Sequence, residues 1–259
     1  MVIRVKHIII FLMLVAVVVA FHIVRRNATM RGIETTVSSS GTSSLMTADD
    51  VDSIIVASYP DIMKTDIKDV DKKGIRKILA KHPYVQEVEV GMSTGGKLTV
   101  DVLLRQPVVR MFYQDNEFYL SRQGTFMPLS RNNYCNILVG SCETKQPRLL
   151  RPTALNLTDT SIRRQPSAIM KIWTLAAYLY DNPEYGEIFD QVCIDSNGDL
   201  VLVPKLGNTT VIVGDTMLLQ EKFENLWAYF DQGARQVVGW DTYKTISLKY
   251  RNQVVCARK

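Results

Sequence analysis

The side chains that could carry chemistry are few in this chain and lie far apart in the sequence. His82 is the only histidine outside the apolar N-terminal stretch and its flank, so a histidine-activated serine or cysteine nucleophile is poorly supported. Glu184 and Glu187 are the carboxylates to consider for a cell-wall hydrolase, which needs two carboxyl groups about 5 to 9.5 Å apart, and we expect both to be exposed. No phosphate-binding loop, dinucleotide fingerprint or G-x-S-x-G elbow occurs in the sequence. Nothing in these residues therefore argues for an enzyme, and they indicate no catalytic residues, no cofactor and no small-molecule substrate.

One acidic stretch resembles the start of a calcium-binding loop. Residues 195–199 read DSNGD, but the glycine is fourth instead of sixth, and position 12 is Leu206 instead of glutamate. The pair Asn197-Gly198 is typical of a tight turn between two strands. We predict such a turn and no metal site.

The four cysteines lie at positions 135, 142, 193 and 256, with no spacing that suggests zinc. In an oxidising compartment, Cys135 and Cys142 are the disulfide pair that sequence proximity favours, although four cysteines permit three pairings. The alternative, four unpaired and mostly buried thiols, stays open.

Basic residues are concentrated at the N-terminus. The chain has 259 residues with 31 Lys or Arg and 26 Asp or Glu, and five of the basic residues but no acidic residue lie in residues 1–32. The remainder is formally neutral. A nucleic-acid partner needs a basic surface, so we predict no nucleic-acid binding.

The basic N-terminal region contains an apolar stretch from Ile8 to Val24. At about 1.5 Å per residue its length approaches the roughly 30 Å of a hydrocarbon core. We predict a cytoplasmic tail over residues 1–7 and a single transmembrane helix over residues 8–24. Its lipid-facing residues would include Ile8, Phe11, Leu14, Val18, Phe21 and Val24. The alternative is a cleaved signal peptide, because small residues occupy positions 18–20. Either interpretation places most of the chain outside the cytoplasm.

Residues 31–106 have the pattern of a small domain with two helices and a sheet. Thr47 is typical of a helix N-cap, and the spacing of Ile75 and Leu79 predicts a second helix that ends before Pro83. Alternating runs at 85–90 and 97–104 predict a β-hairpin. Residues 33–47 suit a Ser/Thr-rich linker, yet 33–37 could equally be a short strand.

Residues 107–259 predict an antiparallel sheet with helices. Short alternating runs at 191–194, 200–203 and 210–213 are separated by turn residues, and helical patterns cover 167–180 and 217–230. Along residues 245–251, apolar and polar residues alternate, so we predict a strand with one buried face, either an ordinary member of the sheet or its open edge. The complete fold class is therefore α+β: one N-terminal transmembrane helix, a small sheet with two helices, and a larger sheet domain.

Several strings together resemble the FtsQ/DivIB family of cell-division proteins, in the form found in Bacteroidetes. They are VDKKGIRKILAKHPYVQEVEVGMSTGGKLTVDVLLRQPVVRMF at 70–112, YLSRQGTFMPLS at 119–130, LVLVPKLGNTTVIVGD at 200–215, EKFENLW at 221–227 and GWDTYKTISLKYRNQVV at 239–255. The family's acidic residue before the proline that closes the hairpin is missing at Arg105 and Gln106. No single motif is decisive, but their order and spacing are specific.

The resemblance implies a non-enzymatic, bitopic inner-membrane scaffold that recruits partners, with a POTRA domain at 31–106 and a C-terminal β domain at 107–259. The N-terminus would be cytoplasmic and the C-terminus periplasmic, at the division septum. Implied partners are FtsB/FtsL-like divisome proteins and other septal proteins, which would bind by strand addition at an open sheet edge. The expected contact residues are Tyr243, Thr245, Ser247, Leu248, Lys249, Tyr250, Arg251 and Val254.

Two other functions stay open at the level of sequence. One is a cell-wall hydrolase of the envelope. The other is a POTRA-type chaperone that binds extended polypeptide, which an unpaired edge on the 97–104 strand would favour.

Overall fold

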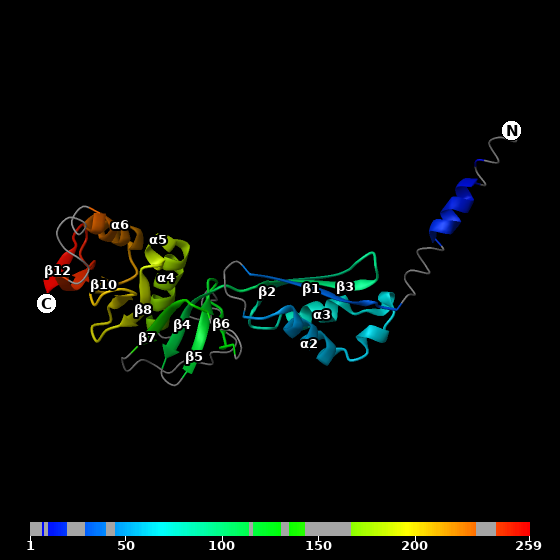
Figure 1. Ribbon diagram of the computed structural model, residues 1–259, viewed down its shortest axis with the longest axis horizontal. Helices are drawn as coiled ribbons and strands as arrows, with labels where there is room; N and C mark the ends of the chain where they lie inside the picture. Colours follow the sequence, from blue (N-terminus) through cyan, green and yellow to red (C-terminus); the bar gives the residue numbers. More distant parts are fainter. Residues whose placement is uncertain are drawn as a thin grey trace. The chain divides into compact units, whose positions relative to one another are not determined.

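The computed structural model of the chain describes residues 7, 10–19, 29–39, 45–113, 116–130, 135–142, 167–231 and 242–259. The chain divides into two compact units, Met1–Leu104 and Arg105–Lys259 (Figure 1). The division falls beside the junction near residue 106 that the sequence predicts.

In the N-terminal apolar stretch, residues 10–19 are helical, and Phe11, Leu14 and Val18 are exposed. Three residues of the predicted span, Ile8, Phe21 and Val24, lie outside the described residues. Within the described residues, no helix combines the length and the apolar character needed to cross a membrane.

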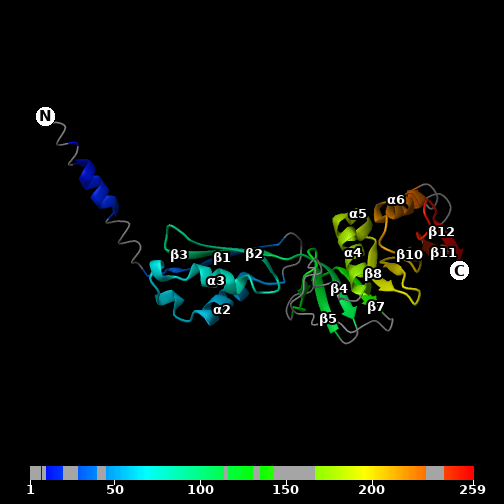
Figure 2. The same ribbon diagram turned by 180° about the vertical axis from the view of Figure 1, so that it is seen from behind.

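The first unit is a three-stranded sheet with helices on one of its faces (Figures 1 and 2). Its elements in chain order are β1 Gly32–Ser39, α2 Ala48–Ser58, the 3₁₀ turns η1 Ile62–Lys64 and η2 Ile67–Asp69, α3 Lys72–Leu79, β2 Val85–Met92 and β3 Lys97–Leu104. The strand order is β1-β3-β2, with β1 parallel to β3 and β2 antiparallel to it. Because β3 is central, the unpaired 97–104 edge that would favour a polypeptide-binding chaperone does not exist.

Local sequence explains both helices of this unit. Thr47 and Asp50 form a reciprocal capping box at the start of α2. The Asp71 carboxylate accepts a hydrogen bond from the Gly74 N–H at 2.9 Å and caps α3. Ile75 and Leu79 are buried, as their spacing predicts. The open question about residues 33–37 is settled in favour of a strand, since they lie within β1.

His82 follows α3 and supports a prediction about pH. Its half-buried ring accepts a hydrogen bond from the Tyr84 N–H at Nδ1, 3.4 Å away. Burial lowers the pKa of His82 from 6.5, and the charge of Asp50 opposes this shift. Because the folded-state pKa lies below the unfolded value, this contribution to stability is complete above the unfolded pKa and is lost as pH falls through the folded pKa.

We therefore expect the protein to lose more stability between about pH 7.5 and about pH 5.5 than a His82→Gln variant loses. Urea unfolding followed by circular dichroism at both pH values measures the difference. Equal losses in the two proteins would contradict the assignment of this pH dependence to His82.

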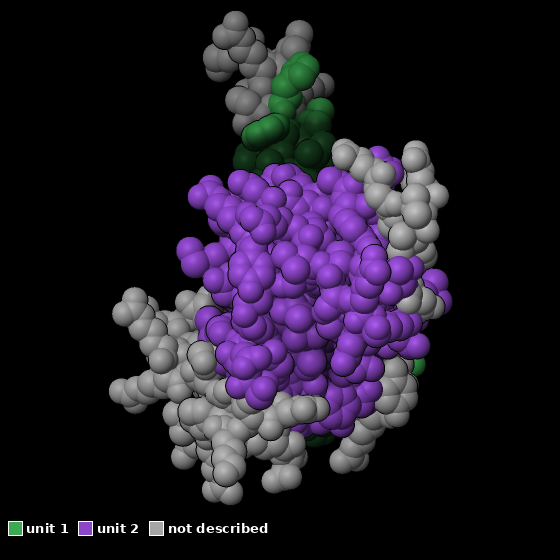
Figure 3. All heavy atoms as spheres, turned by 90° about the vertical axis from the view of Figure 1, so that its left-hand side faces the viewer, with its two compact units in different colours: residues 1–104 green, residues 105–259 purple. Residues whose placement is uncertain are grey.

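The second unit is a nine-stranded sheet whose helices lie together on one face (Figures 1 and 2). Its elements are β4 Pro107–Tyr113, β5 Asn116–Ser121, β6 Phe126–Met127, β7 Leu138–Cys142, α4 Ser167–Asp181, α5 Pro183–Gly186, β8 Phe189–Ile194, β9 Leu200–Pro204, β10 Thr210–Gly214, α6 Leu219–Tyr229, β11 Tyr243–Ser247 and β12 Val255–Arg258. The strand order is β12-β11-β10-β9-β8-β7-β4-β5-β6. Figure 3 colours this unit separately from the first.

Residues of α4 and α6 pack against one face of the sheet and form its core. Gly140 shows how closely α4 approaches β7. A Cβ at this position would lie 2.6 Å from Met111 Sδ and 2.8 Å from Ile172 Cγ2. Only glycine leaves room for the helix at this point.

The prediction of an antiparallel sheet in this unit is wrong in part, because the sheet is mixed. The pairs β4–β7, β7–β8 and β10–β11 are parallel. Parallel neighbours need long connections, and the segments that contain α4 and α6 provide them between β7 and β8 and between β10 and β11. The two predicted helices therefore belong to crossover connections between parallel strands. They do not interrupt an antiparallel meander.

The predicted pairing of Cys135 with Cys142 is not present, and no disulfide joins any of the four cysteines. Cys135 precedes β7 and Cys142 ends it. Residues 138–142 are strand, which rises about 3.3 Å per residue, so β7 carries Cys142 about 13 Å away from Leu138, and a bridge needs Cα atoms within roughly 7 Å. Of the mostly buried thiols in the alternative interpretation, only Cys135 is buried, and the other three cysteines are half-buried.

Candidate functional site: the carboxy-terminal sheet edge

The last strand of the chain, β12, lies at one end of the nine-stranded sheet. Among the described residues it pairs only with β11, through the antiparallel register Ile246↔Cys256 and Ser247↔Val255. Alternate residues of an edge strand direct their N–H and C=O groups away from the sheet. These backbone groups are able to accept another strand.

The predicted edge strand over residues 245–251 is wrong in its position. Residues 243–247 form β11, which is paired on both sides, with β10 and with β12. Leu248 is buried, and its N–H donates to the Ile212 carbonyl at 2.8 Å. The chain then turns, with Asn252 in the left-handed region, and returns as the true edge. The backbone of residues 245–248 is therefore occupied by this chain's own neighbours.

Two predicted contact residues in the turn form ion pairs within the chain. The Lys249 ammonium lies 2.6 Å from Asp199 Oδ2, and this hydrogen bond raises the pKa of Lys249. Arg251 Nε lies 3.7 Å from Glu221 Oε1. These two ion pairs connect the turn to other segments of the same domain. Tyr250, between them, is 57 % exposed and is the turn residue best placed for a partner.

Beneath the edge, the side chains of Cys256 and Tyr243 meet Tyr229 at the end of α6. Burial and hydrogen bonds with these two side chains raise the pKa of Tyr229. Val254, another predicted contact residue, is half-buried and packs on the core. The inner side of the hairpin formed by β11 and β12 is thus fixed to α6.

The outer side of the same hairpin carries no charge. Thr245 and Ser247 lie opposite Ala257 and Val255 in the ladder, so all four side chains share the face turned away from the core. Val255 is 44 % exposed. Lys244 and Arg258 are exposed, and neither has an ion-pair partner among the described residues. A strand that joined this edge would meet small uncharged side chains next to two available cations.

The edge residues that sequence reasoning missed are those of β12 itself, Val255 to Arg258. Their signal was the turn-forming RNQ at 251–253, which divides the final run into two strands. Without that division, the sequence predicts a single edge that carries all eight expected contact residues. The structure assigns Tyr243, Thr245 and Ser247 to an interior strand.

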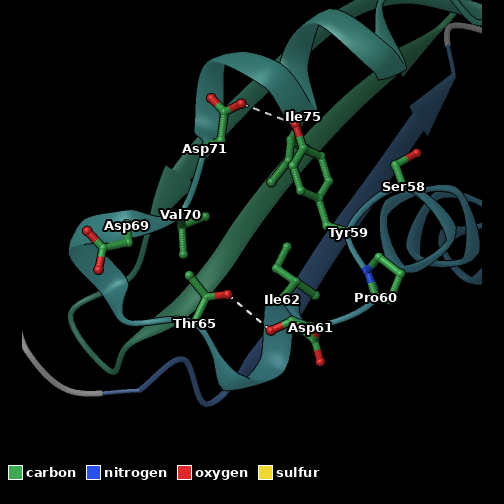
Figure 4. Close-up of a pocket in the computed structure, with 10 residues that line it drawn as sticks. All are labelled: Ser58, Tyr59, Pro60, Asp61, Ile62, Thr65, Asp69, Val70, Asp71 and Ile75. Carbon is green, nitrogen blue, oxygen red and sulfur yellow. Dashed lines mark hydrogen bonds between the residues drawn. The ribbon is translucent and has the colours of Figure 1, made fainter.

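The first unit contains a small pocket between the end of α2 and the start of α3 (Figure 4). Its volume is about 290 Å³, at the lower limit of the roughly 300 to 1,000 Å³ typical of ligand sites. Buried Ile62, Val70 and Ile75 line it. The Tyr59 hydroxyl donates to Asp71 at 3.2 Å, so the polar groups at this pocket serve the local fold.

The described residues contain no cluster of metal ligands, and the two carboxylates considered for hydrolysis lie at the surface. Glu184 and Glu187 are both exposed, as expected. No group of three His, Cys, Asp or Glu side chains among these residues is arranged to hold a metal ion. Residues 195–199 form the predicted turn, in which Asp195 Oδ1 accepts from the N–H groups of Asn197 and Asp199.

Comparison with known protein families shows which family this chain is related to. A family described as FtsQ/DivIB, C-terminal related, matches residues 106–257, which is more than half of the chain. The chain belongs to the FtsQ/DivIB family. A family described as POTRA-like domain matches residues 29–103. No curated protein matches the chain.

Membership confirms the resemblance seen in the sequence and, in outline, the α+β fold with a POTRA-like domain and a large sheet with helices. FtsQ/DivIB proteins are non-catalytic components of the division machinery that act through contacts with other proteins. The residues matched to this family include 255–257 of β12.

Proposed function

We propose that this protein is a non-enzymatic scaffold of the division septum, anchored in the inner membrane by one helix over residues 8–24. Its N-terminus would be cytoplasmic, and both folded units would lie in the periplasm. The family supports the scaffold role. The apolar run between Lys6 and Arg25 supports the anchor.

The scaffold would bind FtsB/FtsL-type partners by strand addition at β12. The observation that carries this proposal is the position of β12 at the end of the sheet, with one neighbour among the described residues. A strand of four residues offers few outward N–H and C=O groups, so side chains must contribute as well. Tyr250, Val255 and the cations Lys244 and Arg258 are exposed beside it.

Site-specific photo-cross-linking tests this proposal. A photoreactive residue at Val255 of the full chain, in dividing cells, should cross-link to FtsB/FtsL-type proteins. The matched control is Leu206, an 80 % exposed apolar residue in the turn between β9 and β10. Cross-links from position 206 but not from position 255 would place the partner elsewhere and refute strand addition at β12.

A further inference from the structure

Helix α3 of the POTRA-like unit carries a concentrated basic surface, which we call the α3 basic face. It consists of Lys72, Lys73, Arg76, Lys77 and Lys81, all exposed. At about 100° per residue, the four within the helix cover a continuous arc of about 140°. The buried Ile75 and Leu79 lie outside that arc. The remainder of residues 29–104 has four Lys or Arg against eleven Asp or Glu. The positive charge is thus segregated on one helix of an acidic domain.

The fold of the unit does not compensate this charge. None of the five side chains has an ion-pair partner among the described residues. The nearest capping carboxylates are already engaged, Asp71 by the Gly74 N–H and the Tyr59 hydroxyl, and Asp50 by Thr47. Lys72 and Lys73 occupy the first turn, where the helix dipole disfavours cations, and Lys72 and Arg76 are like charges four residues apart. Stability of the helix therefore does not account for the α3 basic face.

We propose that the α3 basic face docks the POTRA-like unit on the anionic phospholipid surface of the membrane that holds residues 8–24. This inference rests on the anchor included in the proposed function. Lysine and arginine clusters near a membrane are attracted to anionic headgroups over about one Debye length, roughly 8 Å at physiological salt.

The short connection to the anchor places the lipid surface within reach. The POTRA-like domain begins at Thr29, which bridges to Asp66, and the Met30 N–H donates to the Thr65 carbonyl. Five residue steps separate Val24 from Thr29, so the connection spans at most about 18 Å. A domain of this size has a radius of gyration of about 11 Å, so any side of it can turn toward the bilayer. Binding is then intramolecular, and weak headgroup contacts suffice.

A second copy of the chain is the rival occupant. Glu87, Glu89 and Asp101 lie on the face of the three-stranded sheet away from the helices, with Glu89 directly opposite Asp101. This acidic face could meet the α3 basic face of another molecule. The lipid surface is favoured because the short connection to the anchor keeps every POTRA-like unit near the membrane. A second copy of the chain would instead have to be present at high local concentration.

Lysine acylation of the full chain in nanodiscs with one copy per disc tests the proposal. In discs with about 30 % phosphatidylglycerol, the lysines of the α3 basic face should react about threefold more slowly than in discs of phosphatidylcholine alone. The difference should vanish near 1 M salt, where the Debye length falls to about 3 Å. Lys205 and Lys244, exposed in the second unit, serve as internal references.

The matched variants are Lys73→Gln with Lys77→Gln, and Lys64→Gln with Lys68→Gln on the same unit. The first pair should remove the lipid dependence at Lys72 and Lys81, and the second should preserve it. Equal acylation in both lipids, or an equal effect of both variant pairs, would overturn the docking proposal. Protection that requires two copies per disc would assign the face to a second molecule instead. Extraction of the chain from proteoliposomes by alkaline carbonate would show separately that the anchor is wrong.

Discussion

Proline substitutions at Cys256 and Ala257, made one at a time, are expected to weaken partner binding by at least about tenfold. Neighbouring residues of β12 direct their N–H groups to opposite sides, so one proline removes a bond to β11 and the other removes a donor on the open edge. A lost hydrogen bond accounts for about 0.5 to 1.5 kcal/mol, and the proline ring also blocks close approach of an added strand.

The two substitutions should differ in their effect on stability. The proline on the open edge should leave the urea unfolding midpoint of the second unit nearly unchanged, since edge strands tolerate proline there. The other proline should lower both the affinity for the partner and the urea unfolding midpoint. Calorimetric titration with the periplasmic segments of FtsB/FtsL-type proteins gives the affinity.

Cys256→Ala is the matched control, because it removes the thiol near Tyr229 and retains the backbone N–H. We expect it to retain binding within about threefold, since only a weak side-chain hydrogen bond is lost. Unchanged affinity in both proline variants would refute strand addition at β12.

Phe223→Ala is expected to lower the free energy of unfolding of the second unit by about 3 to 5 kcal/mol. Phe223 of α6 is completely buried, and its ring centroid lies 5.4 Å from that of Tyr178, 5.3 Å from that of Tyr185 and 6.2 Å from that of Phe189. The substitution leaves a cavity between α6 and the sheet. This loss is a large part of the total free energy of unfolding of a domain, which is typically about 5 to 15 kcal/mol.

Trp227→Ala on the same helix is the matched comparison. Trp227 is 48 % exposed and contacts Tyr185 edge-on at 6.2 Å. We expect a loss of about 1 kcal/mol, because only part of its surface is buried. Urea unfolding monitored by circular dichroism measures both variants. Similar losses would show that α6 does not hold the sheet through Phe223.

Much of the secondary structure follows from local sequence. Ile75 and Leu79 repeat at helical spacing and are buried on α3, and the alternation along 200–203 places Leu200 and Leu202 in the core. Thr47 and Asp71 cap their helices because their side-chain oxygens reach backbone N–H groups three residues away. Each of these interactions lies within a few residues of the chain, so the sequence pattern contains it.

The sequence by itself determined the four longer helices of the two units, at least half of the strands, the family and the neighbourhood of the candidate site. Only the tertiary structure decided that β11 is interior and β12 is the edge, and that Leu248 is bonded to Ile212. It also decided that Lys249 is held by Asp199, fifty residues earlier in the chain. The physical reason is that alternation of apolar and polar residues records which face of a strand is buried. It does not record which strands lie on either side, because backbone pairing between distant segments is set by how the helices cross over the sheet.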